Sequence, residues 1–250
     1  MTSRDGERRS FFPYVVLGVI GLVVLWVLVA TGTWNDMLKF RKDIAYLTRQ
    51  HVLLVAISGS AAIVAGVALG IGLSRPGMAR YAEATIQIVN MATAIPTLGK
   101  LALMMIVLGI GAWPAIVGLW VATLLPIVRN TYAGIRAVPA HLVDAARGMG
   151  MAPRRILLDV EIPNALFVVF AGVRTAMAIN VGTAPIAFLI GGGGLGELIF
   201  TGIDLQDQAM MLAGAIPTAL LAIAVDFLFG QAQYWLVPRG VNPLRERGSV

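Results

Sequence analysis

The sequence predicts an all-α integral membrane protein with six transmembrane helices, on three observations. Of the 250 residues, 58% are hydrophobic and only 13% are charged, whereas an ordinary soluble domain carries about 25% charged residues. The mean hydropathy is +0.83. Six apolar stretches are long enough to cross a bilayer, which takes about 20 residues. These stretches are 12–31, 52–73, 84–110, 113–135, 164–190 and 209–237.

Charge and cysteine usage exclude other classes of protein. The formal charge of +6 would suit a nucleic-acid partner only if the basic residues formed one face or run. They lie instead between the apolar spans, where they act as topology signals. The chain has no cysteine, so disulfides and thiol chemistry are excluded. We expect membrane lipid, and no nucleic acid, as a partner.

The first predicted span follows a polar and basic start, residues 1–10. A cleaved signal peptide begins in the same way, but its apolar core spans about 7–15 residues. Here Phe11 to Asn35 carries no charge and lacks a clear small-x-small cleavage site. We therefore expect a retained N-terminal helix.

Residues 33–51 join the first span to the second and carry four basic residues. Their apolar residues follow helical spacing, which is typical of an amphipathic helix on the outer membrane interface, with Trp34 and Tyr46 at headgroup level. A solvated connector is the alternative. The apolar positions are Met37, Phe40, Ile44 and Leu47.

The third span, 84–110, is long enough to tilt or break, and Ile95-Pro96 is its predicted break point. Basic residues orient all six spans, because cytoplasmic loops carry an excess of lysine and arginine. With both termini cytoplasmic, thirteen basic residues face inward and four outward. The inward segments are 1–10, 74–82, 129–163 and 238–250.

The polar island 138–163 lies between two apolar spans, so both of its ends enter the membrane. It predicts two short helices. The first helix has Pro139 in its first turn and ends at Gly148 and Gly150. The second helix begins at Pro153 and ends at Pro163.

Within this island, Asp144-Ala145-Ala146 is followed after three residues by Gly150, and after nine more by Val160-Glu161-Ile162-Pro163. This spacing resembles the EAA loop of ATP-binding-cassette importer permeases: Glu-Ala-Ala, three residues, Gly, nine residues, Ile-x-Leu-Pro. Asp replaces Glu, Val replaces Ile and Ile replaces Leu, and each change conserves charge or shape.

The resemblance implies that a nucleotide-binding ATPase docks on this loop, and that its movements reach the fifth span through Pro163. A small helix with alanines in its middle can lie close to a partner's backbone, in a groove that the partner supplies. An ordinary cytoplasmic loop is the alternative. The expected coupling residues are Asp144, Ala145, Ala146, Gly150, Ile162 and Pro163.

No motif gives this chain an energy source of its own. A P-loop requires G-x-x-x-x-G-K-[ST], but the only Gly-Lys pair, Gly99-Lys100, is followed by Leu101 in an apolar span. His51 and His141 are far apart in sequence and belong to no metalloprotease motif. We expect no enzymatic activity, no metal site and no bound cofactor; ATP and Mg belong to the partner ATPase.

Three charged residues fall inside predicted spans, where charge is costly and marks functional candidates. Arg174 and Asp226 each lie roughly 15 Å from the cytoplasmic side at 1.5 Å per residue, so we expect an ion pair that joins two helices. Lys100 lies about 25 Å along its helix, with snorkelling toward water as the alternative role. The candidates for a translocation path are Asn90, Thr93, Lys100, Asn180 and Thr183, with helix–helix hydrogen bonding as the alternative.

Segment 191–208 joins the last two spans on the outside. Gly191, Gly193 and Gly196 satisfy G-x-G-x-x-G, but a dinucleotide site needs that motif after a strand, and here it follows an apolar helix. A flexible turn is one interpretation. The other is a surface for an extracytoplasmic partner, since Glu197, Asp204 and Asp207 are acidic.

Four further stretches look like permeases of osmoprotectant importers, which take up glycine betaine, choline, carnitine or similar quaternary amines. They are 94–98 (AIPTL), 125–132 (LPIVRNTY), 179–184 (INVGTA) and 193–196 (GGLG). The resemblance runs from about His51 to Pro238. It implies a five-helix type I importer permease core (51–238) after an added N-terminal part (1–50) and before a cytoplasmic tail (239–250). Lys100 departs from the pattern.

The same resemblance implies a multi-pass location in the bacterial inner membrane and three protein partners: the ATPase, a second permease, identical or different, and an extracytoplasmic solute-binding protein. No aromatic cluster in the spans could bind quaternary ammonium, so recognition is expected in the binding protein. Permeases for methionine or sulfonates are the closest rivals. An ion-coupled secondary transporter would need deep carboxylates and inverted repeats, and a structural subunit would need no such loop.

Overall fold

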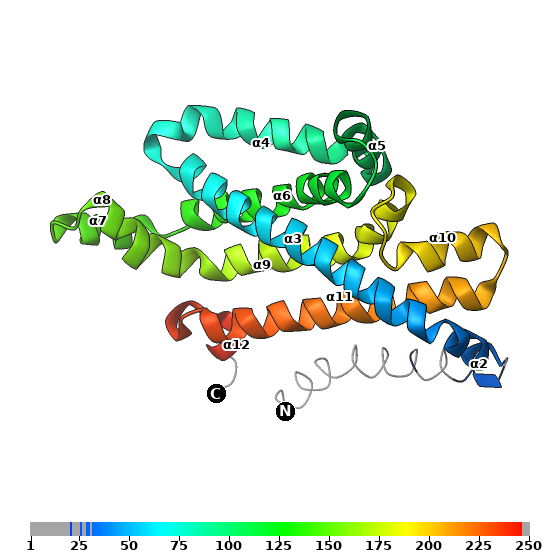
Figure 1. The fold of residues 1–250 in the computed structure, drawn as a ribbon. Helices are drawn as coiled ribbons and strands as arrows, with labels where there is room; N and C mark the ends of the chain where they lie inside the picture. The colour runs from blue at the N-terminus through cyan, green and yellow to red at the C-terminus, as the bar shows by residue number, and fades with distance from the viewer. Residues whose placement is uncertain (1–20, 22–25, 27–28, 31, 247–250) are drawn as a thin grey trace, which may run out of the picture.

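The computed structural model describes residues 21, 26, 29–30 and 32–246, and this part of the chain is built of helices (Figure 1). Four helical runs are long and apolar enough to cross a membrane, and a bent helix pair makes a fifth span if it is counted as one. These correspond to the spans expected from residue 52 onward. The expected first span, 12–31, lies outside the described residues apart from four positions. The four runs are Thr33–Ser74, Ala112–Arg136, Pro153–Ile190 and Gln208–Leu236.

The first run contains α2 (Thr33–Met37), η1 (Leu38–Phe40) and α3 (Arg41–Ser74). α3 alone has 34 residues, which corresponds to about 51 Å, while the hydrocarbon core of a bilayer is about 30 Å thick. Part of α3 therefore extends beyond the length that a crossing needs.

The extended part of this run carries the expected helical stripe. Its apolar residues pack against Leu195, Leu198 and Ala213 of the chain itself. The expected helical spacing is present, and the stripe packs against the C-terminal hairpin, a contact that neither the interfacial helix nor the solvated connector had included.

The third expected span is broken where the sequence placed the break. α4 (Ala79–Ala94) follows the short η2 (Pro76–Met78), and α5 (Thr97–Leu108) continues beyond Ile95 and Pro96. The two helices meet at 92°. Pro96 has no N–H to continue the helix and disfavours helical geometry at the residue before it.

α6 (Ala112–Arg136) returns the chain to the end of the bundle where α4 begins, and a loop of two short helices follows: α7 (Ala140–Gly148) and α8 (Pro153–Ile156) (Figure 1). α8 continues without interruption through the π-helix η3 (Leu157–Glu161) into α9 (Ile162–Thr183). The prediction that Pro163 ends this helix is wrong. The wider π turn accommodates a proline, which lacks the N–H of a regular helical turn.

The remaining chain forms a hairpin and a short tail. η4 (Ala184–Ile190) leads through glycines 191–194 to α10 (Gly196–Asp204), which packs along α11 (Gln208–Leu236). The interpretation of 191–208 as a turn does not hold for half of its length, because residues 196–204 are helical. η5 (Arg239–Val241) and α12 (Pro243–Glu246) complete the described chain.

Glycines allow the close packing of the central helices. A Cβ on Gly66 or Gly70 of α3 would come within 2.7 Å and 2.5 Å of side-chain carbons of Ile127 and Thr131 on α6. A Cβ on Gly172 of α9 would likewise come within 2.5 Å of Asn130 on α6. α6 thus lies between α3 and α9 in a tightly packed layer, as small residues permit in membrane helices.

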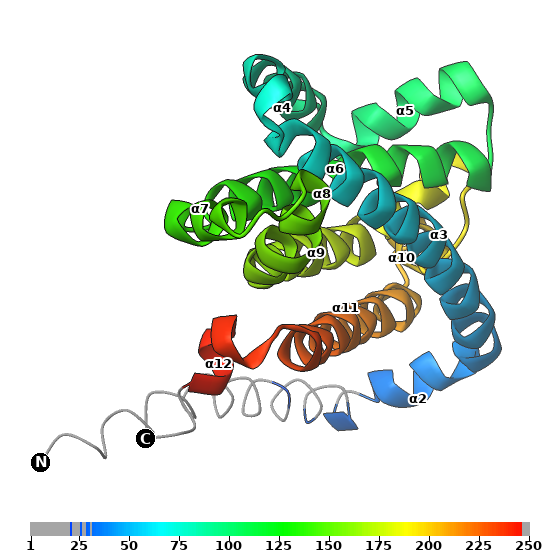
Figure 2. The same cartoon turned by 90° about the vertical axis from the view of Figure 1, so that its left-hand side faces the viewer.

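The bundle has two distinct ends. One end carries the end of α3, the start of α4, the α7–α8 loop and α12, whereas α2, α5 and α10 lie at the other (Figure 1). The view along the bundle in Figure 2 shows α4 and α9 on opposite sides of α6.

Candidate functional site

The α7–α8 loop is shaped by one glycine. Gly150 has a φ of +77°, in the left-handed region that favours glycine. Its N–H donates to the carbonyl of Arg147 at 2.9 Å, and the N–H of Met151 donates to that of Ala146 at 3.1 Å. These two bonds form a Schellman motif. The chain therefore reverses at Gly150 and starts α8 directly afterwards.

The exposed face of α7 differs in part from the expected one. Asp144 and Ala145 are exposed, but Ala146 is buried within the chain, with 2% of its surface accessible. Asp144 and Ala145 therefore lie on the exposed surface of α7, while Ala146 packs inside the chain. Sequence reasoning missed two apolar residues on the surface of this loop, Leu142 and Met149, which are 36% and 74% exposed.

Asp144 takes part in an exposed ion pair. Its Oδ1 lies 3.4 Å from Nη1 of Arg147, one turn along α7, and both side chains are more than 60% exposed. Exposed pairs of this type contribute about 0.2–1 kcal/mol. Asp144 is therefore free to exchange Arg147 for a cation on a docking partner.

Ile162 and Pro163 lie where the loop joins the membrane helix. The N–H of Ile162 donates to the carbonyl of Leu157, five residues earlier, which closes the π turn. π turns inside α-helices are frequent at functional sites. Beside this turn, Arg75 at the end of α3 forms an ion pair with Glu161. In the sequence, Glu161 occupies the variable position of the EAA motif and was given no role. The predicted topology nevertheless places Arg75 and Glu161 at the same membrane surface.

Arg174 of α9 and Asp226 of α11 are brought together. Nε and Nη2 of the guanidinium lie 2.5 Å from Oδ1 and Oδ2 of the carboxylate, so the contact is bidentate. Each side chain is 41% exposed. Both residues belong to helices long and apolar enough to cross the membrane, where an isolated charge would be costly.

The path candidates fall into separate groups. Asn90 and Thr93 lie on α4, and Lys100 lies in the first turn of α5. The depth expected for Lys100 assumed a straight helix and is wrong, because the chain bends by 92° before it. Lys100 is 6% exposed, so its side chain does not extend to the surface of this chain.

Asn180 and Thr183 lie on α9, on the far side of α6 from α4 (Figure 2). Asn180 is fully buried, and its Nδ2 lies 2.9 Å from Oγ of Ser58 on α3. The hydroxyl of Thr183 donates to the carbonyl of Ile179 in its own helix at 2.8 Å. These contacts match the alternative role of helix–helix and intrahelical bonding, and the chain does not bring its path candidates together.

A second buried polar contact joins α3 to α9 near the C-terminus of α9. Nε2 of His51 donates to the carbonyl of Val181 at 3.2 Å, and the histidine is 1% exposed. Next to it, Oε1 of Gln50 accepts the N–H of Gly194 at 3.1 Å. The glycine stretch 191–194 is therefore bound to the start of the α3 span.

Side chains of α3, α9 and α11 line an open cavity of about 260 Å³. Its lining is apolar except for His51 and Ser60, and Phe229 is the aromatic residue among the lining side chains. A quaternary ammonium group binds to a cage of several aromatic faces, which this cavity does not provide. Among the described residues, no group of three or more His, Asp or Glu side chains could hold a metal ion.

Comparison with known proteins identifies the class of molecule to which this loop and these spans belong. Residues 62–240 match the family described as binding-protein-dependent transport system inner membrane component. The chain belongs to this family. It is a permease subunit of a binding-protein-dependent ABC transport system, located in the inner membrane, and it is not itself catalytic. Such a permease works with an ATPase and a binding protein.

Two curated relatives cover most of the permease. The osmoprotectant import permease protein OsmY of Salmonella typhimurium is 49% identical over 210 residues, which are 82% of this chain and 89% of the relative. The choline transport system permease protein OpuBB of Bacillus subtilis is 39% identical over 204 residues, 82% of this chain and 93% of the relative.

A solved structure shares the fold. A chain of the MetNI methionine ABC transporter, in an inward-facing conformation, superposes with a TM-score of 0.70 at 24% identity and covers 78% of this permease and 96% of its own length. The permease therefore has the fold of that chain, and the similarity is evidence for the fold alone.

Proposed function

We propose that this permease imports osmoprotectants, namely glycine betaine, choline, carnitine or related quaternary amines. The observation that carries the proposal is the 49% identity to a relative named as an osmoprotectant import permease, across 89% of that relative. Relatives named for choline and for carnitine are 39% and 38% identical. Methionine and sulfonates remain the rival substrates, and the fold shared with a methionine transporter does not favour them.

The ATPase is proposed to dock on the 138–163 loop. α7 exposes Asp144 and, elsewhere on its surface, the apolar Leu142 and Met149, which suits a partner that offers both an apolar surface and a basic residue. ATP and Mg are bound in that partner. The proposed coupling residues of this chain are Asp144, Ala145, Ala146, Gly150, Ile162 and Pro163, of which Ala146 packs inside the chain.

The end of the bundle that carries this loop is proposed to face the cytoplasm. Its elements hold Arg75, Arg80, Arg147, Arg154 and Arg155, and basic residues concentrate on the cytoplasmic side. α12, which ends the described chain, lies at this end as well, so the C-terminus is proposed to be cytoplasmic. If 12–31 forms a sixth span before the five-span core, the N-terminus is proposed to be cytoplasmic too.

Substrate recognition is proposed to reside in the extracytoplasmic binding protein, because the apolar cavity of this chain offers no aromatic cage. The binding protein would dock on the outer end, where Glu197 and Asp204 of α10 are exposed. A second permease, identical or different, completes the pathway, since the path candidates on α4 and α9 are separated by α6 within one chain.

Uptake measurements test this proposal. A strain that lacks the permease, with and without the restored chain, is grown at high osmolarity and given labelled glycine betaine, choline, carnitine, methionine and taurine in separate assays. We expect restored uptake of one or more of the quaternary amines, and unchanged uptake of methionine and taurine. Uptake of methionine or taurine alone, or equal restoration for all five compounds, would reject the osmoprotectant substrate.

A further inference from the structure

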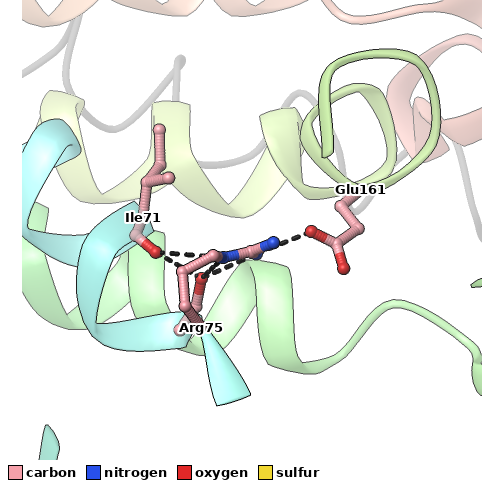
Figure 3. A network of polar contacts seen from close by, with 4 residues as sticks. Ile71, Arg75 and Glu161 are labelled. Carbon is pink, nitrogen blue, oxygen red and sulfur yellow. Dashed lines mark hydrogen bonds and ion pairs between the residues drawn. The ribbon is translucent and has the colours of Figure 1, made fainter. Parts of the chain in front are cut away.

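An ion pair connects the base of the α7–α8 loop to a different membrane helix. Nη2 of Arg75, which directly follows α3, lies 2.6 Å from Oε2 of Glu161 in the π turn that precedes α9 (Figure 3). The residues are 86 positions apart in sequence. The two side chains are 30% and 15% exposed, so water screens this pair less than it screens the fully exposed pairs of the loop.

Arg75 is held in place before it meets Glu161. Its Nη2 and Nε lie 2.9 Å and 3.2 Å from Oγ of Ser74, and Nε also approaches the carbonyl of Ile71 (Figure 3). Ser74 in turn donates to the same carbonyl at 2.7 Å. A cation at the C-terminus of α3 is also favoured by the helix dipole. The guanidinium is therefore oriented toward Glu161 by the end of its own helix.

Glu161 depends on Arg75 for the balance of its charge. Oε2 is buried and accepts no well-aligned hydrogen bond from the described residues, so the ion pair is the contact that the structure gives it. Glu161 is also the last residue of the π turn and lies two residues before Pro163. At that point the α-helical ladder is interrupted twice, by the wide turn and by the missing N–H.

The pair thus attaches a weakened segment of helix to a rigid one. α3 is locked to α6 through Gly66 and Gly70, which leave no room for a Cβ. The π turn, by contrast, joins the exposed loop to α9 and is the segment most able to bend. Without Arg75, a displacement of the loop would bend the π turn and would not move α3. With Arg75, it must move α3 together with α9.

We propose that Arg75 and Glu161 are positioning residues for coupling, and that they pass the movement of the α7–α8 loop to α3. The pair lies on the loop's membrane side and touches neither ATP nor substrate. The inference rests on the proposed docking of an ATPase on this loop, but it does not depend on which solute the permease carries.

The first test measures coupling in the complete transporter, reconstituted with its ATPase and binding protein. In Arg75→Gln and Glu161→Gln we expect ATP hydrolysis to continue while solute uptake per ATP falls, by about threefold to thirtyfold for a coupling residue. The charge-swapped double variant Arg75→Glu with Glu161→Arg should recover part of this ratio. Complex assembly, measured by copurification of the ATPase, should stay at the wild-type level.

An exposed pair at the other end of the bundle provides the control. Lys39 and Asp36 lie 2.7 Å apart, and their side chains are 73% and 54% exposed. Lys39→Gln should leave the uptake per ATP unchanged. An equal loss in the control, or a loss of assembly and ATP hydrolysis in step with uptake in Arg75→Gln, would overturn the proposal and assign the pair a purely structural role.

A second test needs no transported solute, so it separates this inference from the substrate proposal. The chain has no cysteine, and Val64 on α3 and Leu158 in the π turn are 72% and 51% exposed, so both accept spin labels as cysteine variants. In the wild-type background the distance between the labels should stay constant when ATP is trapped in the partner. In Arg75→Gln it should change. If the distance responds equally in both backgrounds, the coupling role is overturned, even where osmoprotectant uptake is established. If the distances behave as expected but osmoprotectants are not taken up, only the proposed substrate is rejected.

Discussion

The guanidinium of Arg174 and the carboxylate of Asp226 meet edge to edge, with two contacts of 2.5 Å between α9 and α11. A bidentate geometry fixes the orientation of both groups as well as their separation. α11 is otherwise the least enclosed of the long apolar runs, with 11% of its most apolar stretch buried. The ion pair is therefore a main polar connection that holds α11 against the rest of the bundle.

Removal of one partner of this pair should destabilise the permease more than removal of both. Asp226→Asn leaves the Arg174 charge between two membrane helices without its carboxylate. We expect a loss between the about 1 kcal/mol of an exposed pair and the about 3–5 kcal/mol of a fully buried one, because each side chain is 41% exposed. Arg174→Gln added to Asp226→Asn should restore part of the loss. The measurement is the midpoint of thermal unfolding in detergent, and strictly additive losses would argue against a coupled pair.

Gly150 should be sensitive to any side chain because of its backbone conformation. Its φ of +77° costs an L residue roughly 1–2 kcal/mol, although a Cβ there meets no atom within 4 Å. We expect Gly150→Ala, and more strongly Gly150→Asp, to impair uptake while the protein inserts at normal levels. Gly148→Ala is the control, since Gly148 also has open space around it but no positive φ. Normal uptake in Gly150→Asp would contradict a coupling role for the loop.

Asn180 should behave as a helix–helix contact and not as a solute contact. Its side chain meets Ser58 across the α3–α9 interface, and such bonds in membranes contribute about 0.6 kcal/mol on average. Asn180→Ala should lower the unfolding midpoint slightly and leave the KM for the solute unchanged, and its combination with Ser58→Ala should be less than additive. Thr183→Ala is the control, because that hydroxyl bonds within its own helix. A changed KM with unchanged stability would place Asn180 on the path.

Local signals in the sequence predicted the parts of the fold that depend on local chemistry. The break at Ile95-Pro96 and the reversal at Gly150 each follow from the residue at that position. The pairing of Arg174 with Asp226 also followed, because two charges at equal depth in neighbouring spans have few other partners.

The remaining features depend on tertiary contacts that sequence patterns do not encode. Pro163 was expected to end a helix, but a π turn absorbs it. The stripe that contains Met37 and Leu47 was expected to be an interfacial helix or a solvated connector, and its packing on the C-terminal hairpin was not foreseen. The contact between Arg75 and Glu161 requires knowledge of which helix ends are adjacent, which charge counting alone does not give.

The packing of α3 on α6 yields a last prediction from two glycines of the same helix. A Cβ on Gly70 would lie 2.5 Å from Cβ of Thr131 and 2.9 Å from the carbonyl of Val128, whereas one on Gly72 meets nothing within 4 Å. Gly70→Ala forces α3 away from α6, and overpacking of this kind costs about 1–3 kcal/mol. Gly72→Ala gains helix propensity, which favours alanine over glycine by about 0.8–1.0 kcal/mol. The unfolding midpoint in detergent should therefore fall for Gly70→Ala and stay level or rise for Gly72→Ala. The proposed transfer of movement requires α3 and α6 to act as one body, so Gly70→Ala should also lower uptake per ATP. Equal unfolding midpoints for the two variants would show that this interface is not closely packed in the membrane.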